Sequence, residues 1–273
     1  MKIKVKPIFW IAAAVICLLG YGMEFFIMLL FAVIHEGGHI TAAWVFGRKC
    51  KEVSITPIGV YAEIAGCDAA EPFEGICIAA AGPAVNIIIA GLCKYIGLLY
   101  IYDINVALAV FNLLIIYPLD GGRIVKYVCE CFMGTISADK TVMRCAYIGA
   151  VLIMVIGILQ TVLFPYNISL ICLGKYLMKV IEKDKVWLGY RFFVKMKEKQ
   201  KKGEVLRIKK FAVSEKTQLG KMLDVMGNWY YSVFTAENGE EISETEIIGY
   251  AEKNGISGSV EDLINASLKK RCD

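Results

Sequence analysis

The stretch FAVIHEGGHITAAWVFG, residues 31–47, places two histidines and a glutamate inside an otherwise apolar segment. An ionisable cluster in such a run is costly, because each polar group gives up water that it cannot easily replace. His35 and His39 are also the only two histidines in the chain. This segment therefore indicates that the three polar side chains carry out a function there.

His35 and His39 are four residues apart, so on a helix both imidazoles project from one face. That spacing suits two ligands of a tetrahedral zinc, with Glu36 beside them as general base for a metal-activated water. The alternative is a pair of hydrogen-bonded histidines that pack one helix against another.

The composition is typical of an integral membrane protein with a polar tail. Of 273 residues, 57% are hydrophobic and only 21% are charged, and the mean hydropathy is +0.57. The ten cysteines are scattered without a CxxC pair, which argues against a disulfide framework or a cysteine zinc site. The net charge of +4 lies near the apolar segments, so we expect no nucleic acid partner.

Six apolar runs lie near residues 7–22, 24–46, 74–97, 100–119, 143–163 and 166–181. They predict a polytopic fold with six transmembrane helices, the first being a retained span and not a cleaved signal. Lysines and arginines gather before the first run, after the second, between the fourth and fifth, and after the sixth. By the positive-inside rule, this predicts a multi-pass protein with both termini in the cytoplasm.

A catalytic zinc needs a third protein ligand, and with no further histidine it must be a carboxylate or a cysteine. At the rise of a helix, His35 and His39 lie roughly 16 to 23 Å in from Glu24, at the outer end of their run. Asp120 lies roughly 25 Å along the fourth run from Asp103, at a matching depth. The adjacent proline and glycines would end that helix and turn the carboxylate inward. Asp120 is the favoured ligand, and the alternative is an ordinary turn residue.

Three motifs follow one another along the chain: HEGGH at 35–39, AGPAVN at 81–86 and FNLLIIYPLDGG at 111–122. In this order they resemble the site-2 protease family of intramembrane zinc metalloproteases. The resemblance implies one zinc per chain and the following residue roles: Glu36 as the base; His35, His39 and Asp120 as zinc ligands; Asn112 and Asn86 as groups that bind the scissile peptide or its oxyanion. Two departures from the family pattern, Gly37 and Ile115, remove no ligand.

Within the family, the chain most resembles the subgroup of stage IV sporulation protein FB. That resemblance implies regulated intramembrane proteolysis of a mother-cell sigma-factor precursor, with membrane inhibitor or activator proteins as partners. It also implies a bacterial inner membrane, specifically the mother-cell membrane around the forespore. The alternatives are an inactive membrane scaffold of the same fold, a metal transporter, and a site-2 protease that acts on an anti-sigma factor or a signal-peptide remnant.

The composition predicts three regions: a six-span protease domain at 1–185, a basic juxtamembrane linker at 186–205, and a small cytoplasmic α/β domain at 206–273. The last region resembles one degenerate CBS repeat, which implies an adenine nucleotide as ligand and a second copy of the chain to complete the pair. Within the first region, EVSITPIGVYAEIAG at 52–66 predicts a β-hairpin at the cytoplasmic face. An ordinary connecting loop is the alternative there.

Overall fold

The computed structural model describes residues 2–56, 59–66, 70–163, 168–202, 206–227, 229–256 and 258–272. The chain forms two compact units. The first comprises Met1–Tyr127 and Cys145–Ile181, and the second comprises Val128–Arg144 and Glu182–Asp273.

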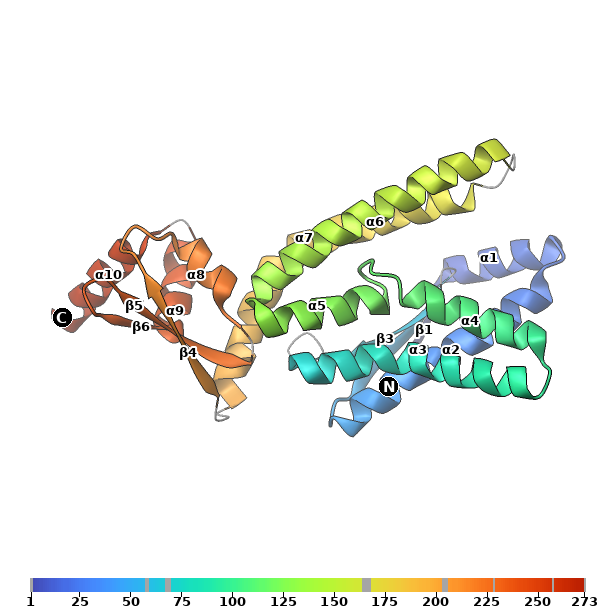
Figure 1. Ribbon diagram of the computed structural model, residues 1–273, viewed down its shortest axis with the longest axis horizontal. Coiled ribbons are helices and arrows are strands. Elements are labelled where there is room, and N and C mark those ends of the chain that lie inside the picture. Colours follow the sequence, from blue (N-terminus) through green and yellow to red (C-terminus); the bar gives the residue numbers. More distant parts are fainter. Residues whose placement is uncertain are drawn as a thin grey trace. The chain divides into compact units, whose positions relative to one another are not determined.

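Four helices form the N-terminal part of the first unit: α1 (Pro7–Leu18), α2 (Gly22–Val45), α3 (Pro72–Tyr95) and α4 (Leu99–Asn112). Helix α3 packs between α2 and α4, and α1 contacts α2 (Figure 1). Three helices of the described part are long and apolar enough to cross a membrane: α2, α3 and α6 (Thr135–Leu163). Helix α4 and the apolar part of α1 are shorter. The structure thus supports a helical membrane protein, while the count of six spans stays a prediction.

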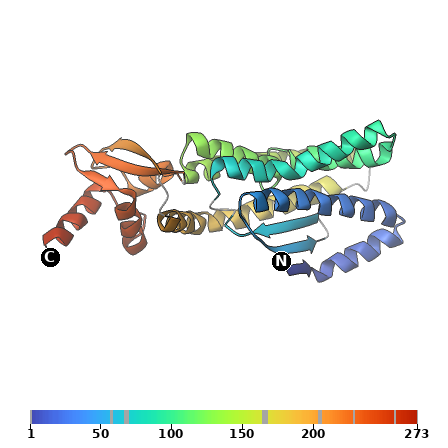
Figure 2. The ribbon, with the colours of Figure 1, turned by 90° about the horizontal axis from the view of Figure 1, so that it is seen from below.

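A small sheet lies along α2 in the first unit (Figure 2). Its order is β1 (Lys2–Val5), β2 (Cys50–Thr56) and β3 (Gly59–Ile64), with β1 parallel to β2 and β2 antiparallel to β3. The predicted hairpin is therefore confirmed, although its turn residues 57–58 lie outside the described part. Strand β1 was not predicted. Strand β3 is an edge strand, and it contacts α2, the helix that carries both histidines.

The chain between α4 and α5 (Asp120–Phe132) turns sharply. The sequence predicted a helix as far as residue 119, but α4 ends at Asn112. A Cβ added at Gly121 would lie 2.2 Å from the Leu113 carbonyl oxygen, and one added at Gly122 would lie 2.4 Å from the Tyr117 nitrogen. Only glycine permits this close return of the backbone. The estimate that Asp120 lies roughly 25 Å from Asp103 assumed one continuous helix between them, and that assumption is wrong.

The rest of the first unit is built from α6 and the start of α7 (Ser169–Lys202). Ala146 and Ala150 of α6 are fully buried and pack with Leu177 and Ile181 of α7 and with Ile116 of the turn before α5. This cluster supports the segment that leads into Asp120.

The second unit contains a three-stranded sheet in the order β4 (Arg207–Val213), β5 (Tyr230–Ala236) and β6 (Glu241–Ser243). Packed with it are α8 (Leu219–Val225), α9 (Glu244–Asn254), α10 (Val260–Cys272) and the part of α7 from Glu182 onward. Strands and helices thus both occur in the tail, and α9 starts at a capping box between Ser243 and Glu246. The unit also takes in residues 128–144, which the predicted boundaries assign to the protease domain.

Candidate metal centre and active site

The buried face of α2 carries both histidines. His35 is 4% exposed and His39 is 2% exposed, and Gly38 and Ala43 share the same face. This pattern follows from the helical spacing, because residues three, four and eight apart lie on one side of a helix. The structure therefore places both imidazoles on one face of α2, as predicted.

Two glycines let α2 and α3 approach closely at this point. A Cβ added at Gly82 would lie 2.3 Å from His39 Nε2 and 2.7 Å from His35 Nε2. A Cβ added at Gly38 would lie 2.9 Å from the Ala81 carbonyl oxygen. The bare backbone of α3 therefore forms one wall of the histidine site.

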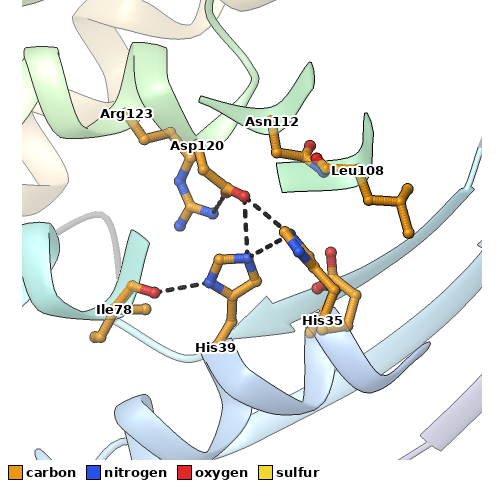
Figure 3. Close-up of polar contacts among 9 residues, drawn as sticks. His35, His39, Ile78, Leu108, Asn112, Asp120 and Arg123 are labelled. Carbon is orange, nitrogen blue, oxygen red and sulfur yellow. Dashed lines mark hydrogen bonds and ion pairs between the residues drawn. The ribbon is translucent and has the colours of Figure 1, made fainter. Parts of the chain in front are cut away.

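The first residue of α5 completes a triangle of ligand atoms (Figure 3). Asp120 Oδ2 lies 3.0 Å from His35 Nε2 and 3.2 Å from His39 Nε2, and the two Nε2 atoms are 3.2 Å apart. Zinc bonds of about 2.0 to 2.1 Å in a tetrahedron place neighbouring ligand atoms roughly 3.3 Å apart. The three atoms therefore already have the spacing that a zinc ion requires.

A hydrogen bond of the second ring nitrogen of His39 determines the tautomer of the neutral imidazole. His39 Nδ1 donates a hydrogen bond to the Ile78 carbonyl oxygen at 2.7 Å. With its proton on Nδ1, the neutral ring directs the Nε2 lone pair at the centre of the triangle, the arrangement typical of a metal-binding histidine. His35 Nδ1 is buried and has no hydrogen-bond partner among the described residues.

Arg123, one turn into α5, faces the other oxygen of Asp120. Its Nη1 lies 3.6 Å from Asp120 Oδ1. This contact leaves Oδ2 directed at the histidines. One sequence signal could have identified Arg123: it stands three residues after Asp120, and on a helix this spacing places the two on one face.

Glu36 lies outside the ligand triangle. Its Oε2 accepts a hydrogen bond from the Ala62 backbone N–H of β3 at 3.0 Å. The structure thereby holds the predicted base between the histidine helix and the edge strand. This partner was not predicted, because a sequence motif identifies side chains and every residue except proline carries a backbone N–H.

The two predicted substrate-binding amides have different surroundings. Asn112 is half-buried at the end of α4, and its Nδ2 donates to the Leu108 carbonyl oxygen at 3.0 Å. Figure 3 shows Asn112 and Leu108 on the α4 side of the site. Asn86 is fully buried, and neither atom of its amide has a hydrogen-bond partner among the described residues. It lies one turn after Gly82 on α3, the residue that abuts both imidazoles.

Comparison with known proteins adds a family match. The model of peptidase family M50 matches residues 23–103 and 97–156, a range that contains all six predicted site residues. In solved structures, the fold is similar to the site-2 protease from Methanocaldococcus jannaschii, with a TM-score of 0.54 and 24% identity. That likeness covers 66% of this chain and 89% of the other, and it concerns the fold.

Two curated relatives match at the level of sequence. Stage IV sporulation protein FB of Bacillus subtilis is 30% identical over 133 residues, which are 45% of this chain and 46% of that protein. A zinc metalloprotease of Methanocaldococcus jannaschii is 27% identical over 163 residues, 55% of this chain and 47% of that one. The match thus spans about half the length of each relative.

Proposed function

Because the membrane part of the chain, residues 23–156, belongs to peptidase family M50, we propose that the protein is an intramembrane zinc metalloprotease. It hydrolyses a peptide bond of a membrane-associated protein near the cytoplasmic face. The observation that carries the proposal is the buried triangle of His35 Nε2, His39 Nε2 and Asp120 Oδ2, with Glu36 beside it.

We assign the zinc to His35, His39 and Asp120. Two imidazoles and one carboxylate leave a fourth position open, as in catalytic zinc sites of other folds. When bound, zinc acts as a Lewis acid that lowers the pKa of a water and polarises a carbonyl. Asp120 and its partner Arg123 stay ionised in this assignment, and the Ile78 carbonyl keeps His39 in the required tautomer.

Glu36 moves the proton. It accepts a proton from the water as the water oxygen bonds to the scissile carbon, and it passes that proton to the departing amine as the C–N bond breaks. The hydrogen bond from the Ala62 N–H orients its carboxylate for this role. We assign Asn112 to the scissile carbonyl, which requires its amide to leave the Leu108 carbonyl, and Asn86 to the substrate backbone or oxyanion.

The substrate adds to the free edge of β3 as an extended strand. A peptide in a helix hides its carbonyls in hydrogen bonds, so it must unwind before it can be cut. An edge strand holds such a segment by its backbone. Among the described strands, β3 pairs with β2 alone, and its Ala62 N–H donates to Glu36 Oε2. A strand added there would therefore run past the base.

We place the protein in a bacterial inner membrane with six spans and both termini in the cytoplasm. The charges of four separate loops support this orientation. For the substrate we propose the membrane-associated pro-sequence of a sigma factor, in sporulation, on the resemblance to stage IV sporulation protein FB. The second unit, as a CBS-like domain, recruits the soluble part of that substrate, and a second copy of the chain and an adenine nucleotide are the partners to test at this domain. Membrane inhibitor or activator proteins are further partners to test for the protease as a whole.

Cleavage in liposomes tests the proposed activity. Purified protein and a single-span test substrate are reconstituted together, and products are identified by mass spectrometry. We expect one cut near the cytoplasmic face, loss of cleavage on zinc chelation, and a fall of at least a hundredfold for Glu36→Gln, since general-base catalysis is worth about 10² to 10⁴ in rate. Zinc content should be unchanged in that variant. Turnover by Glu36→Gln close to that of the wild-type protein would rule out this mechanism.

A further inference from the structure

An apolar cavity of about 70 Å³ lies beside the active site, within the first unit. Its walls come from three elements. Helix α2 contributes four residues from Phe25 to Ala32, the hairpin contributes Thr56 and Gly59, and α4 contributes Leu108.

The described side chains of the wall offer no free hydrogen-bond donor. Among them Thr56 is the one polar residue, and its Oγ1 donates its proton to the Gly59 carbonyl oxygen at 2.8 Å. This lining favours an apolar occupant, because a polar group would lose water and find few partners there.

Each wall of the cavity continues into the active site. On α2, Ala32 lies roughly 6 Å along the helix from Glu36. On α4, Leu108 lies one turn before Asn112, and its carbonyl oxygen accepts a hydrogen bond from the Asn112 side chain (Figure 3). On β3, Gly59 is roughly 10 Å from Ala62, whose N–H is bonded to Glu36. The cavity is thus two to three residues of extended chain away from the base.

We propose that this cavity is a specificity pocket that takes one aliphatic side chain of the substrate, two or three residues from the cut bond. The inference rests on the proposed proteolytic function. A strand on the edge of β3 directs alternate side chains to one face, so one of them meets the cavity while the scissile bond lies at Glu36.

The size of the cavity selects among apolar side chains. A cavity of about 150 Å³ lined by aliphatic groups accommodates a benzene ring. A pocket of about 70 Å³ suits the branched side chain of Val or Leu better than a ring. The pocket therefore favours Val or Leu over Phe and Trp at one substrate position.

A cleavage assay in liposomes tests the pocket with a series of single-span test substrates. Each of the four residues on either side of the cut bond is replaced in turn by Ala, Leu or Phe. We expect one position at which kcat/KM is at least tenfold higher for Leu than for Phe. Ala32→Leu, which fills the cavity, should lower kcat/KM for the Leu substrate at least tenfold and make Ala the preferred residue.

A matched variant separates this effect from general damage. Val33→Leu makes a similar change on the exposed side of the same helix and should leave the preference as it is. Met28→Ala enlarges the cavity and should raise the rate for Phe at that position. Zinc content must stay at the wild-type level in all three variants, which shows that the site is folded.

The possible failures are distinct. If wild-type protein cleaves none of the substrates, the proposed function fails and the pocket fails with it. If it cleaves them, but Ala32→Leu and Val33→Leu have the same residue preference as wild type, the function stands and the pocket is overturned. Binding of the Leu and Phe substrates to a Glu36→Gln protein should show the same tenfold preference without turnover, and equal binding would also overturn the pocket.

Discussion

Asp120 reaches the histidines from 85 residues away along the chain. It is the one carboxylate in the ligand triangle, so Asp120→Ala leaves two imidazoles, too few for a stable catalytic site. We expect purified Asp120→Ala to retain less than a tenth of the zinc of the wild-type protein by metal analysis. Asp103→Ala, which removes an exposed carboxylate on α4, is the control and should retain all of it. Equal zinc in both variants would remove Asp120 from the site.

Arg123 touches the oxygen of Asp120 that does not face the histidines. Groups that hold a metal ligand in this way typically change metal affinity by about 10- to 100-fold. We expect Arg123→Leu to bind zinc about tenfold more weakly in competition with a chelator, and Arg123→Lys to recover part of the loss by keeping the charge. An unchanged affinity for Arg123→Leu would mean that Asp120 is oriented by its helix alone.

The side chains of the site could be predicted from the sequence, whereas its backbone partners could not. The spacing of His35 and His39 is a direct consequence of helical geometry, and the structure brings Asp120 to both of them. Nearly every residue carries a backbone carbonyl and N–H, so no residue type marks the Ile78 carbonyl or the Ala62 N–H as a partner in the site. Their role appears only once α3 and β3 are placed against α2.

At the level of elements, the close contact of α2 with α3 depends on Gly82 and Gly38 but not on Gly37. A Cβ at Gly82 would lie 2.3 Å from His39 Nε2, whereas one at Gly37 would meet nothing within 4 Å. We therefore expect Gly82→Ala to lower both zinc content and melting temperature. Gly37→Ala should instead raise the free energy of unfolding by about 1 kcal/mol, the helix-interior difference between alanine and glycine.

Thermal unfolding of the two glycine variants, together with metal analysis, checks this pair. The same result for both would contradict the close approach of α3 to the imidazoles. The comparison is internally controlled, because both changes add one methyl group within helices of the same unit.

Strand β1 and the end of α4 were not predicted from the sequence, and both have a physical reason. Strand β1 consists of four residues, KIKV, in which lysines alternate with β-branched residues. This alternation is a strand pattern, but it is short and directly precedes an apolar run. Helix α4 ends at Asn112 although the residues to 116 are apolar. The backbone leaves the helix there because it packs against Gly121 and Gly122, a tertiary contact that hydropathy does not record.

At the scale of the whole molecule, the chain divides into two units, and the division is not simply at the end of the last apolar run. Residues 128–144 belong to the second unit, where the Thr135 N–H donates to the Met226 carbonyl oxygen and Lys140 pairs with Asp224. A deletion of residues 207–273 would therefore expose surface at the start of α6. A substitution in the tail core is the cleaner test of what the tail does.

Phe234 is that core position, because it is fully buried and stacks on Phe211. We expect Phe234→Ala to lower the unfolding free energy of the second unit by about 3 to 5 kcal/mol. Limited proteolysis of the full chain should show faster cuts in the tail, while zinc content stays unchanged. Cleavage of a substrate with a soluble domain should weaken, and cleavage of a bare single-span substrate should not. Loss of zinc in this variant would mean that the site depends on the second unit.

The central claim is that two imidazoles and one carboxylate hold a zinc ion in this chain. X-ray absorption at the zinc edge of the purified protein tests it most directly, since the chain also contains ten cysteines that could compete. We predict one zinc per chain, nitrogen and oxygen neighbours at about 2.0 to 2.2 Å, and no sulfur shell. A sulfur neighbour at about 2.3 Å, or a spectrum unchanged by Asp120→Ala, would contradict the account.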